Sequence, residues 1–167
     1  MTTDAIAAAI AENPAGAIED IAAKAGVTPL AVLGALPAGE VVSLPGTLFT
    51  EVMEDITTWG EITFIVNTSN IIFEVKAPLG HGKVGSGMFN LHDKAIGGHI
   101  HYQKCDCIAF VRRKFFGMDT ASMQFYAKDG SCMFKIYLGR DESRALKAEQ
   151  LAAMDALQAR LLKDHAA

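Results

Sequence analysis

Apolar positions in the first sixty residues recur at a helical period. Runs of apolar residues repeat every three or four positions and stop at glycine or proline, which predicts a helix each time. Asn13-Pro14 stops the first run, Gly26-Val27 separates the second from the third, and Gly60 follows the last. The predicted helices span residues 4–12, 17–25, 28–36 and 48–59.

From residue 61 the pattern changes to the two-residue alternation that is typical of strands. Thr68-Ser69-Asn70 joins the first two strands, and Gly130 suits a tight turn that needs a positive φ. Residues 78–87 are rich in glycine and are predicted to form a loop. The predicted strands span residues 61–67, 71–76, 88–91, 98–103, 107–115, 122–127 and 132–138.

The last segment, residues 141–163, has the apolar stripe of a long amphipathic helix, and Asp141 or Ser143 could cap it. Helices at both ends and hairpin-spaced strands between them predict an α+β fold with a large antiparallel sheet. At 167 residues we expect one domain, residues 1–167, with a helical part at 1–60, the sheet at 61–138 and the C-terminal helix at 141–163.

The charges are unevenly distributed along the chain. The net charge is −4, yet residues 1–75 hold one basic side chain, Lys24, against ten acidic ones. The other fourteen cations lie in residues 76–167, so an anionic ligand would find its complement there. The N-terminus carries Asp4 and no basic residue, which makes a poor secretory signal, and no apolar run is long enough to span a membrane. We therefore expect a cytoplasmic protein.

The residues present disfavour nucleic-acid binding, disulfide bonds and a catalytic site. Residues 18–37 have the outline of a helix-turn-helix, but the second helix has no Arg, Lys, Asn or Gln to read bases, and its surroundings are acidic. We therefore expect no nucleic-acid partner. The chain has three cysteines, an odd number, and disulfides are rare in the reducing cytoplasm. We therefore expect the cysteines to be packed free thiols. No catalytic motif stands out, which favours binding over catalysis.

The segment from residue 112 to 140 combines cations with aromatic and methionine side chains. Phe110-Val111 and Phe115-Phe116 flank a run of three cations, and the hairpin that follows ends on further basic residues. Such a mixture suits a flat apolar ligand with anionic edges. The candidate cations are Arg112, Arg113, Lys114, Lys135 and Arg140.

Residues 97–102, Gly-Gly-His-Ile-His-Tyr, hold the best metal-binding side chains. On a strand, His99 and His101 would share one face, and Tyr102 would lie on the other. One alternative is that His99 is an ordinary hydrogen-bonded histidine of the sheet. Another is a zinc site with Cys105 and Cys107, which would require the chain to turn between the two pairs.

Three segments resemble the ChuX/HutX haem-utilisation proteins: RKFFGMDTAS, GSCMFKIYLGRD and MFNLHDKAIGGHI. The resemblance runs from about Asn13 to His165. It implies a dimeric carrier of haem b in the cytosol, with a fold similar to one half of the larger ChuS/HemS proteins. It also places His99 at the family histidine that contacts haem, and imidazole is a known axial ligand of haem iron.

Some relatives carry a second histidine in the first hairpin, in a context such as VHTADVI. The matching segment here is VNTSNII, so Asn67 stands at that position. An amide is a poor ligand for haem iron, and a Tyr, a water or another residue is left for the sixth site.

Together with this resemblance, the sequence predicts a homodimeric haem carrier with His99 next to the iron and Tyr102 as a weaker candidate ligand. The five cations would pair with the haem propionates. The alternative is an enzyme that degrades haem or releases its iron. Expected protein partners are a haem importer or a haem-degrading enzyme.

Overall fold

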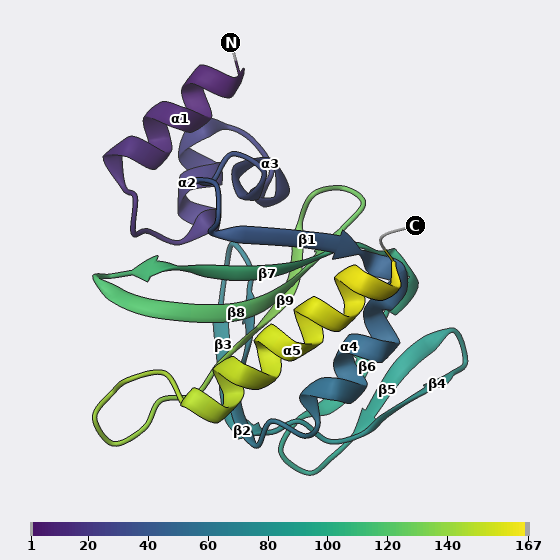
Figure 1. The fold of residues 1–167 in the computed structure, drawn as a ribbon. Helices are drawn as coiled ribbons and strands as arrows, with labels where there is room; N and C mark the ends of the chain where they lie inside the picture. Colours follow the sequence, from purple (N-terminus) through teal and green to yellow (C-terminus); the bar gives the residue numbers. More distant parts are fainter. Residues whose placement is uncertain (1, 166–167) are drawn as a thin grey trace.

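A computed structural model describes residues 2–165 of the chain (Figure 1). The helices are α1 (Thr2–Glu12), α2 (Ile18–Ala25), α3 (Pro29–Leu33), α4 (Phe49–Ile56) and α5 (Ala148–Asp164), with short 3-10 helices η1 (Gly46–Leu48) and η2 (Tyr102–Lys104). The strands are β1 (Val41–Pro45), β2 (Glu61–Asn67), β3 (Ile72–Pro78), β4 (Gly82–Gly85), β5 (Met88–His92), β6 (Gly97–Ile100), β7 (Cys105–Phe115), β8 (Met118–Ala127) and β9 (Cys132–Tyr137).

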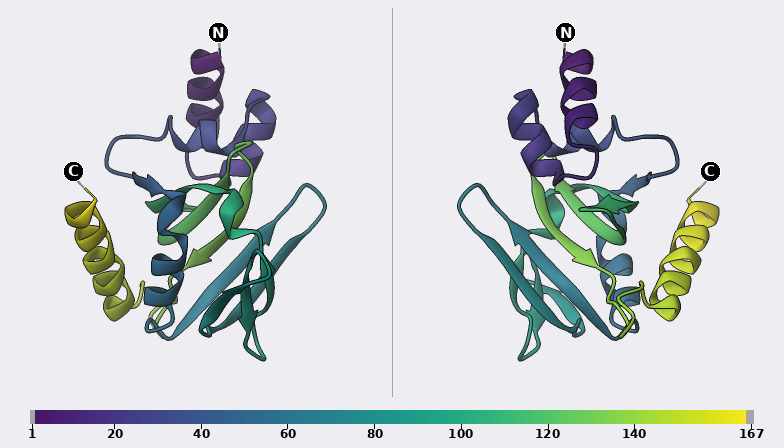
Figure 2. Two further views of the ribbon diagram at one scale, coloured as in Figure 1. Left: turned by 90° about the vertical axis from the view of Figure 1, so that its right-hand side faces the viewer. Right: turned by 90° about the vertical axis from the view of Figure 1, so that its left-hand side faces the viewer.

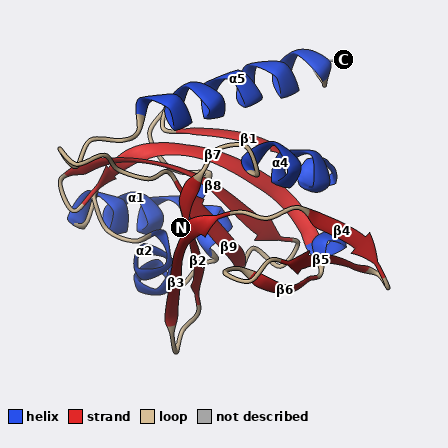
Figure 3. Cartoon of the chain, turned by 90° about the horizontal axis from the view of Figure 1, so that it is seen from below, coloured by secondary structure: helices blue, strands red, loops and turns tan. Residues whose placement is uncertain are grey.

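Within residues 2–165 the strands form two antiparallel sheets. The large sheet has the order β1-β7-β8-β9-β2-β3, and the small sheet has the order β4-β5-β6. Helices α4 and α5 lie on one side of the large sheet, and α1 and α2 lie on the other (Figure 3). The predicted α+β fold with a large antiparallel sheet and terminal helices is confirmed.

Alternation along each strand gives the large sheet two different faces. On β8, Met123 and Phe125 point into the main core, whereas Ser122 and Gln124 point to the opposite face. The main core is aromatic: the ring centroids of Phe125 and Phe134 are 4.3 Å apart and stacked. Helices α4 and α5 cover this side, which we call the core face, and the small sheet packs against the same core.

The N-terminal helices cover part of the other face through a smaller apolar core. Ile18 and Ile21 of α2 belong to a cluster that includes Val111 and Tyr126 of the large sheet. The backbone N–H of Leu30 in α3 donates to the carbonyl of Gly130 at 3.0 Å. The helix pair that resembles a helix-turn-helix is therefore a packing element. It lies at the end of the molecule opposite to the small sheet (Figure 2).

Several predicted boundaries were wrong for local reasons. Strand β1 lies in the part predicted to be helical, and β4 lies in the predicted glycine loop. Helix α5 begins at Ala148 rather than near residue 141, because the Asp141 carboxylate accepts bonds from the N–H groups of Ser143 and Ala145 and so closes a turn. Gly130 has the predicted positive φ, at 82°. No helix within residues 2–165 is long and apolar enough to cross a membrane.

Candidate functional site

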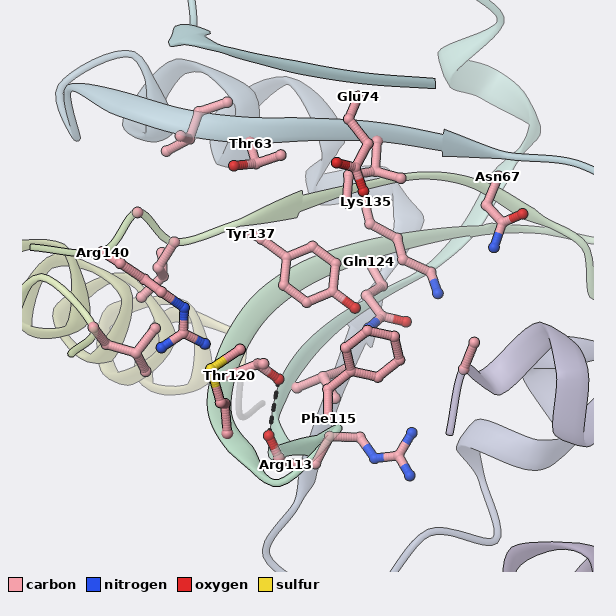
Figure 4. A pocket seen from close by; sticks show the side chains of 18 of the residues that line it. Thr63, Asn67, Glu74, Arg113, Phe115, Thr120, Gln124, Lys135, Tyr137 and Arg140 are labelled. Atoms are coloured by element: carbon pink, nitrogen blue, oxygen red, sulfur yellow. Dashed lines mark hydrogen bonds between the residues drawn. The ribbon is translucent and has the colours of Figure 1, made fainter. Parts of the chain in front are cut away.

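A cavity of about 470 Å³ lies against the face of the large sheet that α4 and α5 leave uncovered. Strands β2, β3, β7, β8 and β9 and the start of α2 supply its lining, and the loop after β9 closes one end. We call this side of the sheet the cavity face. Figure 4 shows its side chains, with Tyr137 between Arg140 on one side and Asn67 on the other. The lining mixes apolar, hydroxyl, amide and charged groups.

The alternation of β2 and β9 explains which residues reach the cavity. Thr63, Ile65 and Asn67 line it, whereas Phe64 between them is buried in the core. Thr63 is paired with Tyr137 and Ile65 with Lys135 across the two strands. From Thr63 to Asn67 the strand rises by about 13 Å. Arg140 lies beyond the other end of the pairing, so these side chains form an elongated strip.

A buried chain of polar groups on β8 includes Gln124, which lines the cavity. The Tyr126 hydroxyl donates to Gln124 Oε1 at 2.6 Å, and Gln124 Nε2 donates to Ser122 Oγ at 3.0 Å. Each of these three side chains has a hydrogen-bond partner within the chain, which stabilises this part of the cavity face.

Lys135 is almost fully buried, at 5% exposure, and is paired with a carboxylate of α2. Its Nζ lies 2.7 Å from Glu19 Oε1 and donates to Oε2 at 2.8 Å. Burial alone would lower the pKa of Lys135, but Tyr137 and Glu19 outweigh this effect, and the net pKa is raised. Burial also raises the pKa of the Tyr137 phenol, which keeps it as a hydrogen-bond donor. The ion pair therefore ties α2 to the cavity.

Arg113 holds the segment between α1 and α2. Its guanidinium donates to the carbonyl of Gly16 at 2.9 Å and to that of Pro14 at 2.5 Å. Its Nε lies 3.6 Å from a Glu40 oxygen and has no hydrogen-bond partner among the described residues. Arg113 borders the cavity, but most of its hydrogen-bonding capacity is used within the fold.

Arg140 is the predicted cation that the described fold leaves without a carboxylate partner. It donates to the carbonyls of Arg144 at 2.8 Å and Asp119 at 2.7 Å, both of which are neutral groups. Among residues 2–165, each of the other four predicted cations forms an ion pair. Arg140 therefore offers the least compensated positive charge beside the cavity.

Arg112 and Lys114 lie around a separate groove of about 990 Å³ at the end of the β7–β8 hairpin. Arg112 faces α5, where it pairs with Asp155 and donates to Gln158 at 2.8 Å. Lys114 pairs with Asp119 at 2.8 Å in an exposed position. The two residues therefore do not line the cavity, although Arg113 and Arg140 border both hollows.

His99 lines neither hollow. It lies on β6 of the small sheet, is exposed, and has its Nδ1 2.6 Å from Oδ1 of Asn90. Tyr102 does not share its surroundings: β6 ends at Ile100, and Tyr102 packs against the core with its ring centroid 6.0 Å from that of Phe49. No three His, Cys, Asp or Glu side chains within the described residues gather as a metal site would require, so the zinc alternative receives no support.

The cysteines are free thiols in the described part of the chain. Burial raises the pKa of both Cys105 and Cys132 to about 12, which makes them poor nucleophiles.

The cavity also contains residues that the sequence did not single out. Tyr137, Gln124 and Glu19 are ordinary strand or helix residues in the sequence, and only the fold brings them together. Asn67 was singled out solely because relatives have a histidine there, and the structure places it in the cavity lining.

Residues 42–157 match the family described as haem utilisation ChuX/HutX, and the chain belongs to this family, as predicted. The intracellular heme transport protein HutX of Vibrio cholerae serotype O1 is 37% identical over 134 residues, which are 79% of this chain and 69% of that protein.

Solved structures agree with this assignment. A protein from Erwinia carotovora has a TM-score of 0.88 and 41% identity over 96% of this chain and 98% of that chain. The heme binding protein ChuX has a TM-score of 0.84 and 37% identity, over 96% of this chain and 99% of its own. PhuS, a heme-binding protein of Pseudomonas aeruginosa, shares the fold alone, with a TM-score of 0.74 and 15% identity. This chain spans 45% of the PhuS chain, which agrees with the expected similarity of its fold to one half of a larger protein.

Proposed function

We propose that this protein binds haem b in the cytoplasm and carries it, intact, from a haem importer to a protein that uses or degrades it. The observation that carries the proposal is the cavity, in a member of a haem-utilisation family. Its volume of about 470 Å³ falls within the usual range for small-molecule sites. Its apolar lining residues, such as Ile65, Val111 and Phe115, suit a porphyrin face, and the cations of the lining suit propionates.

The orientation of the haem follows from the distribution of charge. Arg140 lies at one end of the cavity without a carboxylate partner, so we assign it to a propionate. The other end of the cavity holds Asn67, at the position of a histidine in some relatives, and we place the iron toward that end.

The iron ligand in this proposal is His99 of a second copy of the chain. His99 is exposed and lies outside the cavity of its own chain. In a single chain the cavity would therefore lack a histidine ligand, and His99 would lack a haem cavity beside it. Strand β3 is an edge of the large sheet; Ile71 just before it and Ile72 and Phe73 at its start are 57%, 63% and 56% exposed. Ile72 also lines the cavity, so a partner covering this apolar edge would lie next to the bound haem.

Titration of the purified protein with hemin tests haem binding itself. We expect saturation near one equivalent per chain, and a changed Soret band in His99→Ala. The matched control is His92→Ala, because His92 is also an exposed histidine of the small sheet. An unchanged spectrum and affinity in His99→Ala would remove His99 from the iron.

A mixture of two defective variants tests whether the site is shared. His99→Ala and Arg140→Glu should each bind hemin poorly alone. After subunit exchange, about half of the dimers combine the two variants, and each of these has one intact site, so about a quarter of the wild-type sites should return. No recovery would place both residues on one chain's site.

The alternative function, haem degradation, is tested by supplying ascorbate and oxygen. A carrier should keep its haem apart from slow bleaching that catalase suppresses. A discrete biliverdin-like product, with iron release that catalase does not stop, would overturn the carrier proposal. A ChuS structure named as a heme oxygenase is only 13% identical to this chain. This similarity shows a shared fold and does not support haem degradation by this chain.

A further inference from the structure

The Asn90 side chain connects the β4–β5 turn to His99. Asn90 lies in the middle of β5, where its backbone is paired with Lys83 of β4 and with His99 of β6. Its neighbours Phe89 and Leu91 are buried in the main core, so Asn90 points to the outer face of the small sheet. His99 lies beside it on that same outer face.

The surroundings of Asn90 determine which way its amide points. Nδ2 lies 3.0 Å from the carbonyl oxygen of Gly85, 3.1 Å from that of Lys83 and 3.4 Å from that of Met88. Carbonyl oxygens only accept hydrogen bonds, so the NH₂ group must face them. The opposite orientation would set the amide oxygen against these carbonyl oxygens and lose every bond.

The fixed amide in turn determines the hydrogen on His99. Asn90 Oδ1 faces His99 Nδ1 at 2.6 Å, and an amide oxygen can only accept. The hydrogen of the neutral imidazole must therefore be on Nδ1, which leaves the lone pair on Nε2. No other hydrogen bond to the His99 ring occurs within the described residues, so Nε2 is available to a ligand.

We propose that Asn90 is a positioning residue that holds His99 in the Nδ1–H tautomer and directs Nε2 toward haem iron. This inference rests on the proposed function, in which His99 is the iron ligand. Metal-binding histidines almost always donate their second N–H to an oxygen, which fixes the ring and raises its basicity. Free histidine prefers the hydrogen on Nε2, so Asn90 reverses the preference before haem arrives.

The tautomer can be measured in the haem-free protein by long-range ¹H–¹⁵N correlation of the imidazole nitrogens. The chain has five histidines, and the spectrum of His99→Gln assigns the His99 signals by their loss. We expect a pyrrole-type Nδ1 and a pyridine-type Nε2 in the wild type at a pH where the ring is neutral. In Asn90→Ala the pattern should shift toward Nε2–H. A wild-type His99 that already carries its hydrogen on Nε2 would overturn the proposal.

Two substitutions separate positioning from support of the turn. Asn90→Ala loses the acceptor for His99 and the donor for the turn, whereas Asn90→Asp keeps an acceptor for His99 but sets an oxygen against the turn carbonyls in place of the donor. Asn90→Ala should weaken hemin binding by about 10- to 100-fold. Asn90→Asp should keep the tautomer and the affinity, and shift the ferrous iron–imidazole stretch upward because a carboxylate makes the imidazole more basic. Equal losses in both variants would mean that only the turn matters.

The haem-free spectrum keeps this inference distinguishable from the proposed function. If His99→Ala leaves the hemin complex unchanged while the tautomer follows Asn90, then His99 is not the iron ligand, and the proposed ligand is wrong. If His99→Ala alters the complex but Asn90→Ala changes neither the tautomer nor the hemin affinity, then Asn90 has no positioning role, and His99 is still the proposed iron ligand.

Discussion

The two faces of the large sheet come from the same strands and have opposite chemistry. On the core face, Phe125, Phe134 and Phe64 stack in sequence, with centroids 4.3 and 4.9 Å apart, beneath α4 and α5. On the cavity face, residues one position away in the sequence are polar, such as Gln124 and Lys135. The core face provides most of the apolar burial that stabilises the fold. The cavity face can therefore hold charges and a ligand site without carrying the main core.

A matched pair of aromatic substitutions tests this division most strongly. Phe125→Ala should lower the free energy of unfolding by about 3–5 kcal/mol, because it opens a cavity in a fully buried stack. Phe115→Ala, on the cavity face and half-buried, should cost less than half as much. Urea unfolding of the haem-free proteins measures both values. Equal costs would show that the cavity face is as important for stability as the core face.

The second prediction concerns the cavity face and its ligand. Arg140→Gln should weaken hemin binding by about 1.5–3 kcal/mol, or roughly 10- to 100-fold, because a charge-assisted bond to a propionate is lost. The control is Lys24→Gln, because Lys24 is an exposed cation on α2 that pairs with Glu12. Equal losses in the two variants would mean that only net charge matters.

The third prediction compares Arg113, a cation that bonds within the fold, with Arg140, the cation proposed to bind a propionate. Substitution of Arg113 by Gln should destabilise the protein, because the carbonyls of Pro14 and Gly16 lose their charged donor. We expect a loss of stability with Arg113→Gln and a loss of affinity with Arg140→Gln, measured by urea unfolding and hemin titration on the same samples. A pure affinity effect of Arg113→Gln would assign it to the ligand instead.

The smallest effect concerns pH. Burial raises the pKa of the Cys105 and Cys132 thiols from 9.0 to about 12, so the folded state disfavours the thiolates. Their contribution to stability is complete below pH 9 and falls as pH rises toward 12. At pH 10 each thiol should account for about 1 kcal/mol of lost stability. Between pH 8 and pH 10, Cys105→Ala should lose less free energy of unfolding than the wild type. An identical loss would show that the Cys105 thiol does not contribute to the pH dependence.

The alternation of apolar residues predicted most of the large sheet, because burial on one face imposes a two-residue period. Strands β2, β7, β8 and β9 lie close to their predicted positions. Strand β1 was missed because its sequence, VVSLP, is short and ends on proline, and its pairing with β7 is long-range. Strand β4, GKVG, has too few side chains to show a period.

The site was harder to predict, because the role of each cation depends on partners far away in the sequence. Arg113 bonds to residues 97 and 99 positions away, and Lys135 pairs with Glu19, which is 116 positions away. The sequence could identify the cations but could not tell that Arg140 alone, among the five in the described fold, forms no ion pair. It also could not show that His99 and Asn67 lie on different sheets.

The placement of haem on the cavity face is tested most directly by paramagnetic broadening of backbone amide signals. Ferric hemin broadens nearby signals, and gallium protoporphyrin serves as the diamagnetic reference. We expect broadening in β2 and β9, strongest around Asn67 and Ile65, and sharp signals in α4 and α5. Broadening confined to α4 and α5, or spread evenly over both faces, would contradict haem binding in the cavity.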